Sequence, residues 1–179
     1  PQCYVIYTSF LKTEGLVFKD GYWLGSYRTA FSKMGSSIVN TFVIAGSALV
    51  VIILMAVLIA YLAVRRRNAA TNTMDLISMM PYIIPGSVIG IAMLICFNRP
   101  PLIISGTFLI MIVALVIRRL PYTIRSSVAI LQQIPITIEE ASISLGTSKM
   151  KTFFAITIPM MANGIVSGAI LSWVTMITE

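Results

Sequence analysis

The sequence predicts an all-α integral membrane protein, a polytopic helical bundle with about four membrane-spanning helices. Hydrophobic residues make up 58% of the 179-residue chain and charged residues only 11%, whereas a soluble domain carries about 25% charged residues. Uncharged runs close to the roughly 20 residues that a helix needs to cross a bilayer recur along the chain. This composition excludes a soluble globular domain, a disordered segment and a secreted disulfide scaffold.

Four uncharged runs account for the predicted spans. Segment C is short and gains length if Arg118 and Arg119 extend toward the membrane interface. Segment D follows Pro159, which suits the first turn of a helix. A buried helix of a soluble protein is the alternative for each run, and four such runs in one chain disfavour it. The spans are segment A, residues 42–64; segment B, 76–97; segment C, 102–117; and segment D, 160–178.

The distribution of basic residues predicts the orientation of these spans, because short inner loops are rich in Lys and Arg. We expect residues 65–75 and 118–159 inside and residues 12–37 and 98–101 outside. The net charge of +7 then reflects topology rather than nucleic-acid binding, and a polybasic lipid site is the weaker alternative. Only Arg99 lies between B and C, whereas the basic residues after A and C are Arg65, Arg66, Arg67, Arg118, Arg119, Arg125, Lys149 and Lys151.

The chain is expected to contain an external segment, residues 1–37, and a transmembrane domain, residues 38–179. Residues 4–11 are apolar but too short to cross a bilayer, so they could form the end of a preceding span. The chain begins with Pro1 and stops directly after an apolar run. We therefore interpret it as a fragment of a longer polypeptide.

The spans offer little chemistry for an active site. The chain has no His, and segments A to D contain no Asp, Glu, Lys or Arg. Intramembrane proteases, proton-coupled carriers and ion-ring channels need such groups at membrane depth. No GxxxxGK[ST] phosphate loop occurs, so we expect no ATP site of that kind. Cys3 and Cys96 lack metal-ligand spacing, and we expect no metal site.

Segment B is predicted to be a broken helix. Pro81, Pro85 and Gly86 lie within six residues; the two prolines remove two backbone donors, and the glycine loosens the helix further. Broken helices at membrane depth often line a pathway, because their freed carbonyl groups need partners. Pro81, Pro85 and Gly86 are therefore candidate pathway or hinge residues, and a kink used only for packing is the alternative. Asp75 is expected near the N-terminus of this helix.

The region 118–159 is amphipathic and is expected to contain short helices. The first covers residues 126–131, and Pro135 and Thr137 open the second, with Thr137 as the N-cap. Glu139 and Glu140 then fall in its first turn, where a carboxylate is favourable.

A glycine is predicted to end this second helix. Gly146 has the place of a C′ residue, and Thr147 or Ser148 can cap the helix that follows. The resulting helix–turn–helix would protrude on the inner side and suit the groove of a partner protein.

The run from residue 140 to residue 159 resembles the EAA loop of ABC-transporter permeases. It reads E-A-S, three residues, G, nine residues, I-T-I-P, and the family pattern is E-A-A, three residues, G, nine residues, I-x-L-P. Ser142 and Ile158 are the departures, and both are small or apolar changes. With the N-T pair at 40–41, M-P-Y-I-I-P-G at 80–86 and R-R-L-P-Y-T-I-R-S at 118–126, the chain resembles bacterial ferric-iron transport permeases.

This resemblance implies a type I ABC importer permease-like fold in the bacterial cytoplasmic (inner) membrane. The loop 118–159 would couple the pathway to cytoplasmic P-loop ATPase subunits, which bind the ATP, so this chain would be no enzyme and bind no cofactor. An extracytoplasmic substrate-binding protein would deliver cargo, and a second permease bundle, in the same chain or another subunit, would complete the pathway. The implied coupling residues are Glu139, Glu140, Ala141, Ser142, Gly146, Thr147, Ser148, Ile156 and Pro159.

Ferric iron is the cargo that the resemblance favours, and permeases for thiamine, polyamines or phosphonates are the alternatives. A secondary carrier that uses segment B as a cation site is disfavoured by the EAA-like loop, which such a carrier does not need. An intramembrane enzyme is disfavoured by the lack of acidic residues in the spans.

Overall fold

A computed structural model describes residues 2–14 and 17–178 and divides the chain into two compact units, Pro1–Phe42 and Val43–Glu179. Helix α2 (Gly25–Arg65) begins in the first unit and continues in the second. The sequence predicted a span opening near residues 40–42, but α2 begins at Gly25 and passes through this point without a break. The uncharged segment A is therefore only the later part of a longer helix.

The first unit contains a short helix, a hairpin and the start of α2. Helix α1 (Gln2–Ser9) precedes strands β1 (Leu11–Glu14) and β2 (Val17–Tyr22), which pair antiparallel. The Ser9 Oγ and Tyr27 Oη atoms are 2.6 Å apart, which joins α1 to α2. Residues 12–37, expected as an external connecting loop, are thus mainly a hairpin and a helix; their side of the membrane stays a prediction.

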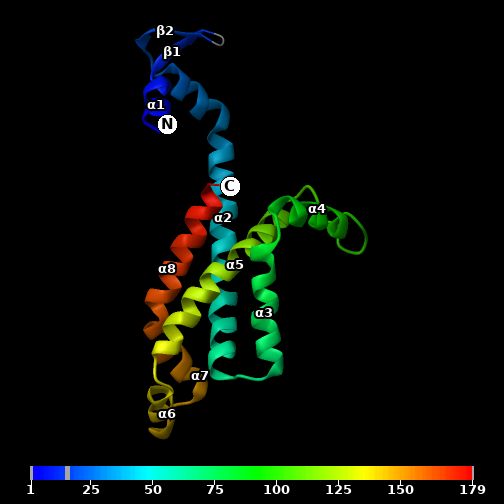
Figure 1. The fold of residues 1–179 in the computed structure, drawn as a ribbon, viewed down its shortest axis with the longest axis vertical. Helices are drawn as coiled ribbons and strands as arrows, with labels where there is room; N and C mark the ends of the chain where they lie inside the picture. The colour runs from blue at the N-terminus through cyan, green and yellow to red at the C-terminus, as the bar shows by residue number, and fades with distance from the viewer. Residues whose placement is uncertain (1, 15–16, 179) are drawn as a thin grey trace. The chain divides into compact units, whose positions relative to one another are not determined.

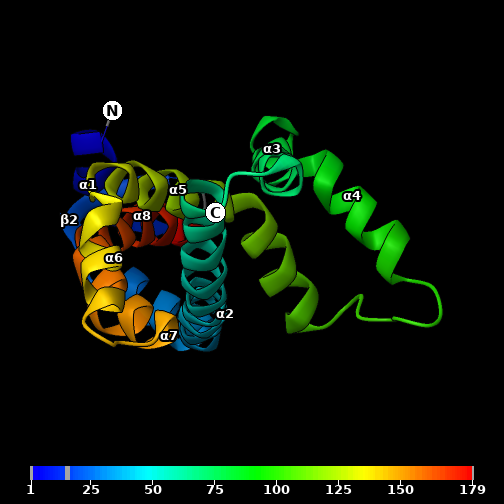
Figure 2. The same cartoon turned by 90° about the horizontal axis from the view of Figure 1, so that it is seen from below.

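The second unit is a helical bundle. Helices α5 and α8 pack side by side, α5 crosses α2, and α6 and α7 gather at the end of the unit where α2 ends and α3 begins (Figures 1 and 2). After α2 come α3 (Ala69–Ile83), α4 (Gly86–Phe97), α5 (Phe108–Gln133), α6 (Ile136–Ser144), α7 (Lys149–Thr152), the π-helical turn η1 (Phe153–Thr157) and α8 (Ile158–Ile177).

Small residues allow these helices to approach closely, as is usual in membrane bundles. Helix α2 contributes the fully buried Ala48, Ala56 and Ala60 to the core. Helix α8 faces α5 with a GxxxG motif, and a Cβ atom on Gly168 would lie 2.8 Å from the Thr123 Cα atom. Any larger residue at this position would force α5 and α8 apart.

By length and composition, two helices of the described residues can cross a membrane: Gly25–Arg65 and the run Lys149–Ile177. A third span results if α3 and α4, which are bent by 110°, count as one. These helices cover segments A, B and D apart from residues 84–85 and 178. Segment C does not meet this criterion, because residues 102–107 are not helical and α5 continues past Arg118 to Gln133.

The continuation of α5 corrects the predicted inner loop, which began at residue 118. The Arg119 Nη2 atom donates to the Thr175 carbonyl oxygen at 3.3 Å, near the C-terminal end of α8. Helix α8 has 20 residues and is therefore roughly 30 Å long. Arg119 thus lies far from Lys149 and Lys151, with which the sequence grouped it. Arginine is a good helix former, so Arg118 and Arg119 mark no helix end.

Candidate functional site

The α6–α7 element, residues 136–152, is closed by a glycine turn. Gly146 has φ +88°, the left-handed conformation that ends helices. Its N–H donates to the Ile143 carbonyl at 2.9 Å, and the Thr147 N–H donates to the Ser142 carbonyl at 3.1 Å. These two bonds form a Schellman motif and confirm the predicted C′ glycine. No atom lies within 4 Å of an added Cβ, so the need for glycine is conformational rather than steric.

The starts of the two helices agree with the sequence at one position and not at the other. Ser148 caps α7, since its Oγ atom accepts from the Lys151 N–H at 3.3 Å. Helix α6 begins directly after Pro135, so the predicted N-cap Thr137 is wrong and lies inside the helix. Only Glu139 falls in the first turn, and Glu140 lies beyond it.

Glu139 points into the unit and forms a buried ion pair with Arg65 at the last residue of α2. The Arg65 Nε atom donates to Glu139 Oε1 at 2.9 Å, and each side chain is 9% exposed. The Tyr61 hydroxyl donates to Glu139 Oε2 at 3.3 Å. The Arg65 Nη2 atom also donates to the Ile134 carbonyl at 2.9 Å. One side chain of α2 therefore binds both the end of α5 and the first turn of α6.

Ser142 points inward as well. Its Oγ atom lies 3.0 Å from Thr152 Oγ1 in a buried contact between α6 and α7. The EAA family pattern has alanine at this position. In this chain a serine replaces it, and the serine hydroxyl has a buried partner in Thr152. Next to this contact, the rings of Tyr61 and Phe153 meet edge to face with centroids 4.8 Å apart.

The opposite face of the α6–α7 element is exposed. It carries Glu140 and Ala141, and Leu145 is 88% exposed beside the glycine turn. The residues that the resemblance grouped thus divide between two faces, with Glu139 and Ser142 inside and Glu140 and Ala141 outside.

The remaining residues of the implied coupling set lie at the edges of this element. Thr147 is half-buried and Ser148 exposed in the turn before α7. Ile156 is half-buried in η1, and Pro159 lies in the first turn of α8. Pro159 lines an apolar hollow of about 480 Å³ between α2 and α8. The role of each in coupling stays a prediction.

The predicted break in segment B is confirmed between α3 and α4. Pro81 lies inside α3, whereas Pro85 directly precedes α4 and Gly86 begins it. A Cβ atom on Gly86 would lie 2.8 Å from Arg118 Cζ, so the arginine of α5 packs against the break. A pathway or hinge role for Pro81, Pro85 and Gly86 is not tested by this geometry.

Helix α3 is held to α5 by more exposed contacts. Asp75 Oδ2 and Arg125 Nη1 are 3.5 Å apart, with side chains 29% and 54% exposed. Asp75 does not lie at a helix start as predicted, because α3 begins at Ala69. Its N-terminus is instead closed by a capping box of Asn68 and Thr71.

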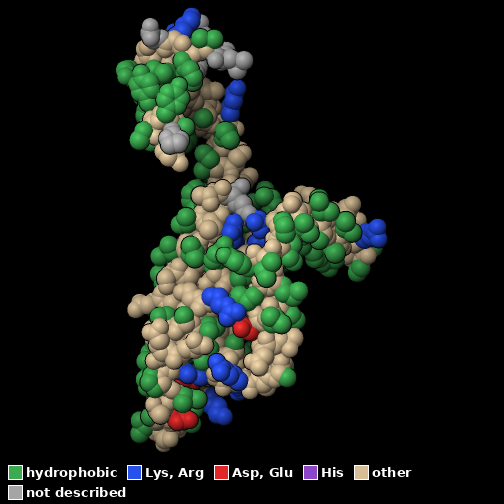
Figure 3. All heavy atoms as spheres, in the orientation of Figure 1, with side chains coloured by type: hydrophobic (Ala, Val, Ile, Leu, Met, Phe, Trp, Pro, Cys, Tyr) green, Lys and Arg blue, Asp and Glu red, His purple; other side chains and the backbone are tan. Residues whose placement is uncertain are grey.

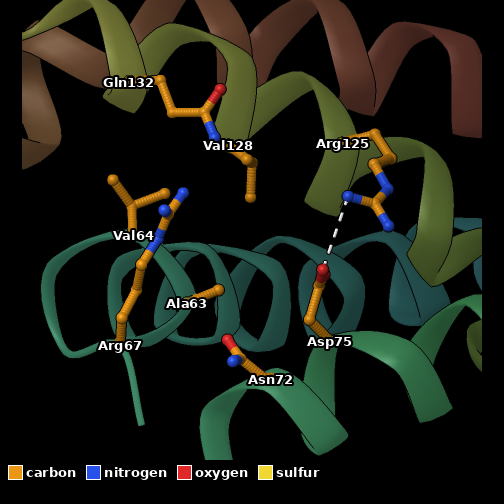
Figure 4. A pocket seen from close by; sticks show the side chains of 8 residues that line it. All are labelled: Ala63, Val64, Arg67, Asn72, Asp75, Arg125, Val128 and Gln132. Atoms are coloured by element: carbon orange, nitrogen blue, oxygen red, sulfur yellow. Dashed lines mark ion pairs between the residues drawn. The ribbon is translucent and has the colours of Figure 1, made fainter.

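A polar hollow of about 310 Å³ lies between α2, α3 and α5 (Figure 4). Arg125 reaches across it to Asp75. Basic and acidic side chains gather in this part of the second unit, while hydrophobic ones cover α4 (Figure 3). Within residues 2–14 and 17–178, no cluster of His, Cys, Asp or Glu could hold a metal ion. The lining residues are Ala63, Val64, Arg67, Asn72, Asp75, Arg125, Val128 and Gln132.

Comparison with known proteins identifies the family of this chain. A family model described as "Binding-protein-dependent transport system inner membrane component" matches residues 21–179. The chain belongs to this family. The description of this family, a component of a transport system, agrees with the transport permease that the sequence predicted.

Relatives of this transport family differ in the cargo that their names state. The ferric transport system permease protein FbpB of Actinobacillus pleuropneumoniae and the putative FbpB 1 of Haemophilus influenzae are each 32% identical over 97% of this chain. The molybdate/tungstate permease WtpB of Pyrococcus abyssi is 29% identical over 78% of it. The chain spans 24% and 26% of the two ferric relatives, about a quarter of their length.

A solved structure supports the fold of this family member. The inward-facing MetNI methionine ABC transporter matches with a TM-score of 0.61 and 22% identity, over 79% of this chain and 66% of that one. This likeness confirms the predicted type I importer permease-like fold.

Sequence reasoning missed Arg65 and Tyr61 as parts of the site. Arg65 was counted only as an orientation signal at the end of a span, and no local pattern pairs it with Glu139. The close approach of α5 and α8, by contrast, had a visible signal in the GxxxG motif at Gly164 and Gly168.

Proposed function

We propose that this chain forms one permease bundle of an ATP-driven importer in the bacterial inner membrane. In this proposal the α6–α7 element docks on a cytoplasmic P-loop ATPase, which binds and hydrolyses the ATP. Family membership supports a binding-protein-dependent transport system. The exposed face around Glu140, Ala141 and Leu145 is the observation that carries the docking site.

This face has the properties of a docking surface. Two apolar side chains of this face are exposed, Leu145 at 88% and Met150 at 66%. Basic residues lie beside them, and charged side chains are unfavourable among lipid tails, so this end of the bundle lies outside the bilayer core. Ala141 allows close approach, and Glu140 supplies a charge for a basic partner. The Schellman turn fixes these residues before contact, which lowers the entropy lost on binding.

The charge distribution supports a cytoplasmic location for the element. Arg65 ends α2, Arg66 and Arg67 directly follow it, and Lys149 and Lys151 lie in α7 at the same end of the unit. Basic residues collect on the cytoplasmic side of membrane proteins. Residues 65–75 and 134–152 are therefore the inner segments in this proposal.

Ferric iron is the proposed cargo, delivered by an extracytoplasmic binding protein to a pathway completed by a second permease bundle. The names of the two FbpB relatives support ferric iron. Molybdate or tungstate is the second candidate, because the WtpB relative matches over most of this chain.

The proposal is tested with the complete permease polypeptide, its ATPase and its binding protein in proteoliposomes. We expect ATP-dependent uptake of ferric iron and none of molybdate. Leu145→Ser and Glu140→Lys should each release the ATPase during purification. Tyr22→Ser, at a residue 77% exposed in the first unit, is the matched control and should retain it. Retention of the ATPase by both α6–α7 variants would contradict the docking site, and uptake of molybdate alone would reassign the cargo.

A further inference from the structure

The α6–α7 element is fastened to the last turn of α2 rather than resting on it. Arg65 and Tyr61 are one helical turn apart on α2, and both donate hydrogen bonds to Glu139. Arg65 also binds the Ile134 carbonyl, where α5 ends. The contact therefore joins α2, α5 and α6 at one buried point.

A second set of contacts extends this fastening to the far arm of the element. The Tyr61 ring packs on Phe153 at the start of η1. Ser142 and Thr152 join α6 to α7 through their buried hydroxyl groups. Both arms of the turn are thereby tied to α2, directly or through each other.

Stability alone is a weak explanation for this ion pair. Burying two charges carries a desolvation penalty, and an apolar pair of similar volume is often as stable or more so. A buried ion pair with directed hydrogen bonds does, however, restrict the partners to one arrangement. The helix α3 lacks such a fastening, since its ion pair with α5 is 54% exposed at Arg125.

We propose that Arg65 and Glu139 are positioning residues that make α2 and the α6–α7 element move as one body. Displacement of a docked ATPase is then passed directly into α2, the helix that contributes much of the core. The proposal rests on the docking function proposed above. It assigns to α2, rather than α3, the first movement inside the permease.

The test measures movement in the complete transporter rather than uptake of a cargo. Cys3 and Cys96 are replaced by serine, and spin labels are placed at Leu58 on α2 and Ile77 on α3, which are 56% and 57% exposed. Pulsed dipolar spectroscopy gives the distance between the labels without nucleotide and with ATP and vanadate. We expect a shift of this distance on ATP trapping in the otherwise unchanged permease.

Arg65→Met and Glu139→Leu should each abolish this shift, because each leaves one buried charge without its partner and frees the element from α2. The ATPase should still co-purify, since the exposed face is untouched. The double variant Arg65→Met with Glu139→Leu restores an apolar contact and should regain the shift. Arg99→Met, the same change at an exposed arginine between α4 and α5 and away from the docking face, is the control and should keep the shift.

Each outcome decides the inference. A permease that never retains its ATPase overturns the docking function, and an absent shift despite a retained ATPase overturns only the inference. A full shift in both Arg65→Met and Glu139→Leu also overturns the inference. Loss of the ATPase from these two variants overturns it as well, because their exposed docking face is unchanged. If the single variants fail to accumulate, the double variant decides. Accumulation of the double variant with the ATP-dependent shift supports the coupling of α2 to the α6–α7 element, and accumulation without the shift contradicts it.

Discussion

The second unit contains two helix breaks that are closed in different ways. At the α6–α7 turn, Gly146 lets the backbone satisfy its own carbonyl groups, and a buried ion pair holds the helix to α2. At the α3–α4 break, Pro85 precedes α4 without a side-chain cap. The long side chain of Arg118, not the backbone, packs against Gly86 there.

We propose that this difference separates a break that transmits a movement from one that absorbs it. The α6–α7 turn keeps its angle, because opening it would separate buried side chains from their partners, namely Glu139 from Arg65 and Ser142 from Thr152. A break held by exposed or long side chains can change angle at lower cost. We therefore regard the α6–α7 turn as a rigid lever and the α3–α4 break as a joint.

The largest effect is expected from breaking the buried ion pair. Arg65→Met leaves the Glu139 carboxylate buried without its guanidinium and should lower the stability of the folded permease by about 3–5 kcal/mol. Arg125→Met removes the exposed ion pair and is the matched control. Unfolding of the purified permease in detergent, followed by intrinsic fluorescence, compares the two. Equal losses for both variants would contradict the difference between the breaks.

Removing one hydroxyl of the α6–α7 contact should have the next largest effect. Ser142→Ala leaves Thr152 Oγ1 buried without its partner and should cost about 1–3 kcal/mol in the same unfolding measurement. The double variant Ser142→Ala with Thr152→Val removes both hydroxyls and should recover most of this loss. A double variant as unstable as the sum of its single changes would show that the two hydroxyls do not act as a pair.

The glycine turn should tolerate substitution according to backbone conformation alone. Gly146→Val forces a β-branched residue into the left-handed region at a cost of about 1–2 kcal/mol and should re-aim α7. Gly146→Asn suits this region far better and should be nearly neutral. Co-purification of the ATPase distinguishes them: we expect loss with valine and retention with asparagine. Equal retention would argue against a fixed lever.

At the open break, the expected effect is on transport rather than stability. Pro85→Ala restores a backbone donor and should favour a straighter α3–α4 helix. Uptake should fall while insertion and ATPase association stay normal. Membrane yield and co-purification serve as controls, and unchanged uptake would favour a kink used only for packing.

The smallest effect is expected at the exposed pair of α3 and α5. Asp75→Asn removes a charge whose partner Arg125 is 54% exposed. Such pairs contribute about 0–1 kcal/mol because water and salt screen them. Stability measured at low and high salt should differ little between this variant and the unchanged protein. A loss approaching that of Arg65→Met would mean that α3 is held to α5 as firmly as α6 is held to α2.

Local signals in the sequence predicted the parts of the site that depend on neighbouring residues. Gly146 ends its helix, Ser148 caps the next, and the chain breaks at Pro85 because each of these residues acts on its own backbone. Thr137 failed as a cap because Pro135, two residues earlier, already sets the start of the helix.

The inward face of α6 could not be predicted in the same way. Glu139 and Glu140 are adjacent acids in one pattern, and only the bundle decides that Glu139 faces Arg65, which lies 74 positions away in the sequence. The length of α5 was also hidden, because charge was taken to end a span. Arginine is a good helix former, so Arg119 lies inside α5, and its side chain donates to a carbonyl group of α8.

The most direct test of the account is a photo-crosslink from the exposed face of the lever. A benzophenone amino acid replaces Leu145, which is 88% exposed, in the complete transporter, and Tyr22 carries the same probe as a control. The account predicts an adduct between the permease and the ATPase from position 145 and none from position 22. Normal yields of both proteins without an adduct from position 145 would contradict it.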